Sequence, residues 1–171
     1  MNFILRKSQP REPERRAPPA QILAVASGKG GVGKTWMSIT LASTYAFKGK
    51  RVLLVDGDLG CANVDIQLGI APEADLTAVI AGWISLEDAV TPVNGGSSKS
   101  GGFDVLPGRS GSGALADLPR EEAGRLAAGI AALALRYDLV ILDLAAGIDP
   151  NNMRLARSAD RALVIANDEP T

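Results

Sequence analysis

The feature that most constrains the fold is a segment rich in glycine and lysine, residues 27–35, which reads Ser-Gly-Lys-Gly-Gly-Val-Gly-Lys-Thr. It follows an apolar run, Ile22–Ala26, that predicts a buried strand, and it opens onto residues 35–48, whose apolar spacing predicts a helix. Glycines let the backbone turn its N–H groups inward, and such amides bind an anion together with the positive end of a helix. The segment therefore predicts a strand–loop–helix unit that binds phosphate groups.

Counted from Gly28, the segment fits the P-loop pattern G-x-x-x-x-G-K-S/T. In that pattern the lysine, here Lys34, reaches the β- and γ-phosphates of a nucleotide, and the Thr35 hydroxyl group ligates Mg²⁺. A glycine-rich turn with incidental lysines would explain the glycines but not Lys34 and Thr35 at these offsets. We expect positive φ angles at Gly28, Gly30, Gly31 and Gly33. The predicted nucleotide contacts are Gly28, Lys29, Gly30, Gly31, Val32, Gly33, Lys34, Thr35 and Trp36.

Carboxylates follow two further apolar runs. Asp56 and Asp58 come after residues 51–55, and Asp143 comes after residues 138–142. Ligands of an open α/β sheet bind beyond the carboxyl ends of its strands, so we expect these acids beside the P-loop. An apolar strand that ends in an acid is the Walker B arrangement, in which the acid contacts Mg²⁺ directly or through water. A polar turn after a strand would also favour Asp and Gly, but it would not explain acids next to a P-loop.

Strands and helices alternate along the chain, which predicts an α/β fold with a doubly wound, mostly parallel β-sheet flanked by helices. Residues 94–102 are expected to form a flexible loop rather than a phosphate site, because no strand is expected before them and no helix after them. Residues 1–20 contain four prolines and alternating charges and predict a flexible tail, which leaves residues 21–171 as the folded domain. The expected strands are 22–26, 51–55, 103–106, 138–142 and 162–166, and the expected helices are 35–48, 64–68, 76–81 and 119–135.

Composition excludes several classes of function. The chain has no histidine, which excludes histidine metal sites and Ser-His-Asp catalysis, and its one cysteine, Cys61, excludes an internal disulfide and fits a reducing compartment. No apolar run approaches the roughly 20 residues of a membrane span. The net charge is −1, and because residues 1–20 carry five basic and two acidic side chains, the remainder carries −4. We therefore expect a cytoplasmic protein without a strong general attraction to DNA.

The run from Lys29 to Thr35 resembles the deviant Walker A motif of the MinD/ParA family of ATPases. In that family the early lysine reaches across a dimer interface to the nucleotide of the partner, so the resemblance implies a trans-acting role for Lys29 and an ATP-bound homodimer. A solvated loop lysine is the alternative. The resemblance also implies the P-loop NTPase fold, with ATP and Mg²⁺ as ligands.

The stretch from Asp56 to Asp65 resembles a switch region of the same family, particularly of its FlhG type, which reads like D-x-D-L-G-x-x-N-x-D. The resemblance implies that Asp58 orients or polarises the attacking water, that Asp56 joins the Mg²⁺ shell and that Asn63 belongs to the nucleotide-responsive switch. The predicted catalytic residues are Lys29, Lys34 and Asp58. The predicted metal-site residues are Thr35, Asp56, Asp58 and Asp143.

Residues 145–148, Ala-Ala-Gly-Ile, resemble the P-A-G-I switch II of the family, with departures. Leu144 stands where the family usually has Thr, Ser or Cys, and Ala145 stands where it usually has Pro. Asp149 stands where MinD has an acid that faces the lysine of the partner. These departures bear on the rate of hydrolysis. Relatives also continue past the position of Thr171, so the chain is expected to be a fragment or a shortened homologue, incomplete at the C-terminus.

Three functions are compatible with these patterns. The first is a slowly hydrolysing, dimerising ATPase switch of the MinD/FlhG type that controls the placement or number of flagella or cell division and has a protein partner; contact with the inner face of the membrane is expected only through a further C-terminal part. The second is a ParA-like ATPase that partitions DNA or cargo, which the charge of −4 outside the tail disfavours. The third is a truncated nucleotide-binding module that does not hydrolyse ATP.

Overall fold

One β-sheet forms the centre of the part of the chain that the structure describes, residues 21–58, 60–97, 99–109 and 118–168. In this computed structural model the sheet has six strands in the order β3-β4-β2-β5-β1-β6. Neighbouring strands are parallel except β3 and β4, which are antiparallel. The predicted tail, residues 1–20, lies outside the described residues. The strands are β1 (Gln21–Ser27), β2 (Val52–Gly57), β3 (Thr91–Val93), β4 (Phe103–Leu106), β5 (Leu139–Ala146) and β6 (Arg161–Val164).

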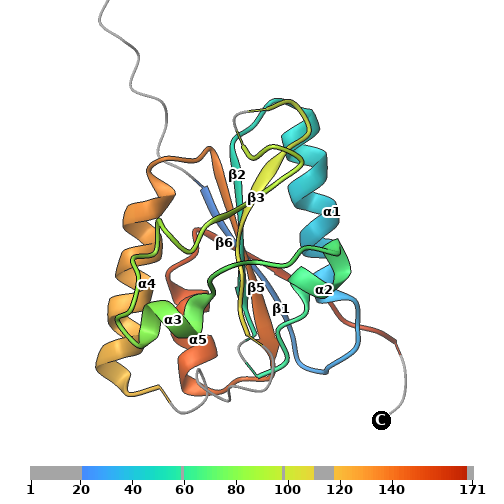
Figure 1. Ribbon diagram of the computed structural model, residues 1–171. Coiled ribbons are helices and arrows are strands. Elements are labelled where there is room, and N and C mark those ends of the chain that lie inside the picture. The colour runs from blue at the N-terminus through green and yellow to red at the C-terminus, as the bar shows by residue number, and fades with distance from the viewer. Residues whose placement is uncertain (1–20, 59, 98, 110–117, 169–171) are drawn as a thin grey trace, which may run out of the picture.

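Helices cover both faces of the sheet (Figure 1). On one face lie α1 (Lys34–Phe47) and α2 (Val64–Leu68). The other face is covered by α3 (Leu76–Ile80), α4 (Arg120–Ala134) and α5 (Pro150–Arg157). The architecture is therefore the doubly wound α/β fold that the alternation of patterns predicts.

The central strands are apolar along their whole length because both of their faces are buried. Leu53 and Val140 belong to a cluster that includes Leu126 of α4. The neighbouring residues Leu54 and Ile141 point to the opposite cluster, which contains small residues of α1. The sheet thus separates two apolar cores, and its middle strands contribute to both.

The register of the parallel strands aligns the ends that carry the predicted site. Asp56 of β2 lies opposite Asp143 of β5, and Ser27 at the end of β1 lies opposite Ala146 of β5. The loop that follows β1, the residues that follow β2 and the last residues of β5 therefore share one edge of the sheet. These three segments therefore lie close enough to form one site without a loop from another part of the chain.

Most predicted elements are confirmed, with differences at their ends. Asp56 and Asp143 lie inside β2 and β5 rather than after them. Strand β5 continues to Ala146 because Leu144 is buried and pairs with Gly57 of β2. Pro119 is the N-cap residue of α4 rather than part of its first turn.

The sequence patterns missed β3 and α5. Strand β3 has only the residues Thr-Pro-Val, and a proline is tolerated there because the strand lies at the edge of the sheet. Helix α5 begins with an Asp N-cap followed by Pro150, a start signal present in the sequence. It was missed because its polar residues do not form an apolar stripe.

Truncation of Ile141 tests the buried centre of the sheet. Its side chain is 0% exposed, whereas that of Ile148 is 83% exposed. We expect Ile141→Ala to lower the free energy of unfolding by about 2–5 kcal/mol, since it removes buried apolar area and leaves a cavity. The matched control Ile148→Ala should change it by less than about 0.5 kcal/mol. Urea unfolding measures both, and equal effects would show that the two positions are buried alike.

Candidate nucleotide-binding site

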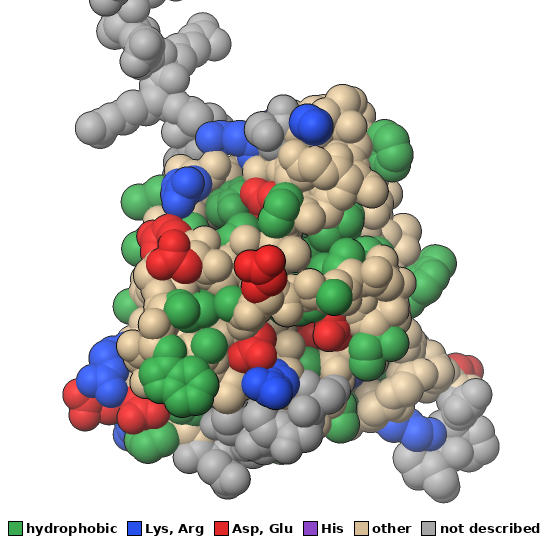
Figure 2. Space-filling view, viewed as in Figure 1, with side chains coloured by type: hydrophobic (Ala, Val, Ile, Leu, Met, Phe, Trp, Pro, Cys, Tyr) green, Lys and Arg blue, Asp and Glu red, His purple; other side chains and the backbone are tan. Residues whose placement is uncertain are grey.

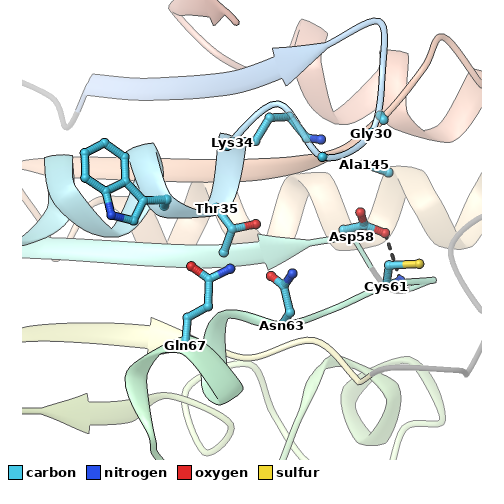
Figure 3. A pocket seen from close by; sticks show the side chains of 12 residues that line it. Gly30, Lys34, Thr35, Asp58, Cys61, Asn63, Gln67 and Ala145 are labelled. Carbon is cyan, nitrogen blue, oxygen red and sulfur yellow. Dashed lines mark hydrogen bonds between the residues drawn. The ribbon is translucent and has the colours of Figure 1, made fainter.

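A pocket of about 530 Å³ lies where β1, β2 and β5 end. The loop between β1 and α1 forms one side of it, and the segment between β2 and α2 forms another (Figure 3). Ala145 and Ala146, at the end of β5, complete the lining. The structure thus brings together the P-loop and the predicted switch segments. The predicted site residues that line the pocket are Gly30, Gly31, Gly33, Lys34, Thr35, Trp36, Asp58 and Asn63.

The P-loop glycines have two different functions in the backbone. Gly31 and Gly33 have positive φ angles of 74° and 93°, which strain any residue with a side chain. The expectation of positive φ at Gly28 and Gly30 is wrong, because neither has a φ in that region. A Cβ atom built on Gly28 or Gly30 would meet nothing within 4 Å, so these glycines leave open space beside the backbone. That space fits the close approach of a phosphate group.

Lys34 and Thr35 begin α1, directly after Gly33, which is its N-cap. The Lys34 side chain lies under the curve of the loop and extends towards Gly30 (Figure 3). Thr35 projects into the same space from the first turn of the helix (Figure 3). A cation and a hydroxyl group therefore stand at the positive end of a helix, where the helix dipole also favours an anion.

Asp143 lies beneath this first turn and is 1% exposed. The hydroxyl group of Ser38 donates a hydrogen bond of 3.0 Å to its Oδ1 atom. Burial raises the pKa of Asp143, while the hydroxyl groups of Thr35 and Ser38 and the charge of Lys34 lower it. The carboxylate is thus placed against the hydroxyl group that the P-loop pattern assigns to Mg²⁺. Its contact with the metal stays a prediction.

Asp56 ties the segment after β2 to the sheet. Its Oδ2 atom accepts hydrogen bonds from the backbone N–H groups of Asn63 and Val64, both 3.1 Å, and its Oδ1 atom accepts one from Asp58, 3.3 Å. Burial raises the pKa of Asp56 to about 7, opposed by these backbone hydrogen bonds and increased by the charge of Asp143. The structure therefore gives Asp56 a part in loop structure that the sequence did not indicate. Its place in the Mg²⁺ shell stays a prediction.

Asp58 and Asn63 face the pocket from the segment between β2 and α2 (Figure 3). The Oδ1 atom of Asp58 accepts a hydrogen bond of 3.0 Å from the backbone N–H of Cys61, which fixes the direction of the carboxylate. Its side chain is only partly buried. Of the three predicted acids, Asp58 is the one that lines the pocket, and its water-orienting role stays a prediction.

Lys29 and Asp149 are not among the described residues that line the pocket. Lys29 is exposed, and its backbone carbonyl accepts a hydrogen bond of 2.7 Å from the Ser27 hydroxyl group. Asp149 caps α5 by accepting hydrogen bonds from the backbone of Asn151 and Asn152. Asp149 therefore has a structural role within its own chain. The trans-acting role of Lys29 stays a prediction.

Sequence reasoning missed several pocket residues. Gln67 of α2 lines the pocket, and the Ser38 hydroxyl group donates a hydrogen bond to Asp143. Cys61 also lines it. The helical spacing of four residues from Lys34 to Ser38 was a usable signal, because both side chains lie on one face of α1.

Comparisons with known proteins agree with this geometry. A family model described as an AAA domain matches residues 20–170, nearly the whole chain. The chain belongs to the MinD/ParA family of P-loop ATPases. The identification made from the P-loop and switch motifs is thereby confirmed, and so is the α/β fold class.

Individual relatives carry more specific names. The antiactivator FleN of Pseudomonas aeruginosa is 39% identical over 154 residues, which cover 90% of this chain and 52% of FleN. The septum site-determining protein MinD of Bacillus subtilis is 32% identical, over 87% of this chain and 54% of that protein. MinD of Pyrococcus horikoshii, solved in complex with Mg-ADP, superposes with a TM-score of 0.73 at 30% identity, over 88% of this chain and 59% of that one. The chain spans about half the length of the curated relatives it matches.

Two further findings concern the described residues. None of the helices there is long and apolar enough to cross a membrane. The same residues contain no group of three or more Cys, Asp or Glu side chains placed to hold a metal ion by themselves.

Asp56 makes the stability of the nucleotide-free protein depend on pH. Its pKa in the folded state, about 7, lies above the ordinary value of 3.8. The folded state therefore holds this proton more tightly, so the contribution is complete below the ordinary pKa and is lost as the pH rises through about 7. We expect this carboxyl group to lower the free energy of unfolding by about 2–3 kcal/mol between about pH 5 and pH 8.

Urea unfolding at the two pH values, without Mg²⁺ or nucleotide, measures this effect. Asp56→Asn removes the titrating group. The change in the free energy of unfolding between the two pH values should therefore be smaller by about 2–3 kcal/mol. The control Glu73→Gln, an exposed carboxyl group, should leave it unchanged. An equally steep dependence in Asp56→Asn would show that another group is responsible.

Proposed function

We infer that this chain binds MgATP in the pocket at the end of β1 and hydrolyses it slowly, as a nucleotide-dependent switch of the MinD/FlhG type. The observation that supports this most is the convergence of the P-loop, Lys34 and Thr35 on one pocket at the edge of the sheet, with the buried Asp143 against the Thr35 hydroxyl group. The MgADP complex of the related Pyrococcus horikoshii protein supports the choice of ligand. The predicted nucleotide contacts are the residues from Gly28 to Trp36 and Asn63.

Each residue of the pocket has a distinct part in this proposal. The amides of residues 28–33 and the ammonium group of Lys34 bind the phosphates and neutralise charge that moves towards the β–γ bridge. Thr35 and Asp143 would hold a Mg²⁺ ion, which would supply positive charge to the phosphate groups. Asp58 orients the attacking water, its carboxylate being fixed by the Cys61 amide. Asn63 lies on the same segment as Asp58. It contacts the nucleotide, and this contact differs between bound ATP and bound ADP.

Dimerisation and partner binding extend the proposal. Lys29 is exposed and follows Gly28 in the P-loop, and in an ATP-bound dimer it contacts the nucleotide of the second copy. Unassisted switch NTPases hydrolyse slowly until a partner completes the site, and Leu144 and Ala145 bear on this rate. The similarity to FleN and MinD supports a role in the number or placement of flagella or of the division site. Such a protein acts in the cytoplasm or at the inner membrane face.

Two other functions remain as alternatives. A ParA-like DNA-partition ATPase would need a basic surface, but Figure 2 shows basic and acidic side chains interspersed over the α3–α4 side, without a continuous basic stripe. A nucleotide-binding module that does not hydrolyse ATP is favoured by one sequence observation, namely Leu144 at a position where the family has a hydroxyl or thiol. A hydrolysis assay separates this alternative from the switch.

Substitution of Lys34 and Asp58 should separate binding from hydrolysis. Lys34→Ala removes a charge-assisted contact worth about 1.5–3 kcal/mol, so MgATP affinity should fall about 10- to 100-fold. Asp58→Ala should leave affinity within about threefold and reduce phosphate release about 100-fold or more, because it removes only the group that places water. Lys50→Ala, an exposed lysine beyond the far end of α1, is the matched control.

The tryptophans provide the binding signal. The chain contains two, Trp36 in the pocket lining and Trp83, which is 79% exposed on a different part of the surface. In a Trp83→Phe background, Trp36 fluorescence should change on addition of MgATP, and the titration gives the affinities. Equal phosphate release from the unsubstituted chain, Lys34→Ala and Asp58→Ala would contradict ATP hydrolysis at this site.

Lys29→Ala tests the proposed trans contact. We expect MgATP affinity of the monomer to change by less than about threefold, because the lysine contacts the nucleotide of the other copy, while the ATP-dependent dimer weakens at least about tenfold. Sedimentation of the Asp58→Ala background with MgATP measures the dimer without turnover. A dimer of unchanged strength in Lys29→Ala, or none in the parent, would contradict the trans role.

A further inference from the structure

A second pocket, separate from the nucleotide site, gathers arginines between α4 and α5. It has a volume of about 580 Å³. Its lining includes Arg120 at the start of α4 and Arg154 and Arg157 in the last turn of α5. Leu118, Pro150 and Met153 provide apolar walls. We call these six residues the arginine pocket; its described lining contains no acidic side chain.

Folding alone explains only part of this arrangement. Arg154 and Arg157 lie at the negative end of α5, where the helix dipole favours cations. Arg120, however, is the first residue of α4, where the dipole disfavours a cation. Arg154 donates a hydrogen bond to the backbone carbonyl of Arg120, which brings the two arginines together despite their like charge. Among the described residues, no ion pair compensates Arg120, Arg154 or Arg157.

The arginine pocket is connected to the nucleotide site through Asn152. The Nδ2 atom of this buried side chain donates hydrogen bonds to the carbonyl oxygens of Ala145, 2.7 Å, and Gly147, 3.2 Å. Ala145 also lines the nucleotide pocket. Asn152 and Arg154 belong to the same short helix. A shift of α5 therefore moves a group that holds the edge of the nucleotide pocket.

We propose that the arginine pocket binds an acidic peptide segment of a partner protein, which acts on the nucleotide site through α5 and Asn152. The effect of the peptide on the nucleotide site rests on the proposed ATPase function, whereas peptide binding itself does not. The carboxylates of the segment compensate Arg120, Arg154 and Arg157, and an apolar side chain between them packs on Leu118 and Met153. The pocket thus selects a segment in which acidic and apolar residues alternate.

The chemistry of the pocket favours a peptide over a nucleic acid. Nucleic acids are bound through many phosphate contacts along an extended basic surface, whereas this pocket offers three cations in a concave site with apolar walls. The chain also carries a net charge of −1, which provides no long-range attraction for a polyanion. Three charge-assisted contacts around an apolar centre match a short acidic segment.

The probe is a blocked synthetic peptide, Glu-Leu-Glu-Glu-Leu-Glu, titrated into the ¹⁵N-labelled full chain without nucleotide. We expect the amide signals of α5 and of Arg120 to shift and those of residues 145–147 to follow, with a Kd of about 1 mM or tighter. The double variant Arg154→Gln/Arg157→Gln should weaken binding at least about tenfold, since each charge-assisted bond is worth about 1.5–3 kcal/mol. Arg136→Gln, an exposed arginine beyond the far end of α4, should bind normally.

The other arms of the titration decide between sources of negative charge. A lysine analogue of the peptide, inorganic phosphate and a thymidine oligonucleotide should leave the α5 signals unchanged at the same concentration. Three outcomes would each overturn the proposal. In the unsubstituted chain, the shifts could spread over all arginines, or the α5 signals could stay unshifted. Phosphate or the oligonucleotide could also shift the α5 signals as much as the peptide does. A separate MgATP titration reports on the P-loop. Its failure would contradict the ATPase function and leave peptide binding to stand or fall on its own data.

Discussion

The pairing of β5 with β1 on one side and β2 on the other is the constraint on which the site depends. It aligns Asp143 with Asp56 and brings the loop after β1 to the same edge. Because these strands are buried on both faces, a slip of one residue would move every side chain to the opposite core, where its packing partners differ. The chemistry at the edge is therefore positioned by apolar packing in the middle of the sheet.

Two buried carboxylates next to each other are the cost of this arrangement. Burial raises the pKa of both Asp56 and Asp143, and backbone amides and hydroxyl groups only partly compensate them. A pair of acids whose negative charge is only partly balanced by the fold suits a site that binds cations. The ammonium group of Lys34 is one such cation, and its charge lowers the pKa of Asp143. If the proposed Mg²⁺ site is correct, stability and ligand binding are linked at the same carboxylates, as is common where pKa values are perturbed.

Long apolar runs and the P-loop pattern were sufficient to predict the doubly wound fold, most element positions and the P-loop residues that line the pocket. Strand β3 and helix α5 could not be found in this way, since the first is held by pairing with β4 and the second by its Asp149 cap rather than by an apolar stripe. The amide contacts of Asp56 were also hidden, because they depend on how the segment after β2 folds back. The roles of Lys29, Asp58 and Asn63 came from family resemblance, which geometry alone does not test.

The hydrogen bonds that Asp56 accepts from the backbone of Asp58, Asn63 and Val64 have a consequence for selectivity among ligands. They arch the segment between β2 and α2 over the sheet before any ligand arrives, so an incoming molecule loses little affinity to ordering it. Nucleoside diphosphates and triphosphates would then encounter the same preformed segment between β2 and α2. Under the proposed function, discrimination between them is left to the terminal phosphate and to the few side chains that line the pocket beside it, among which Asp58 and Asn63 are the proposed sensors.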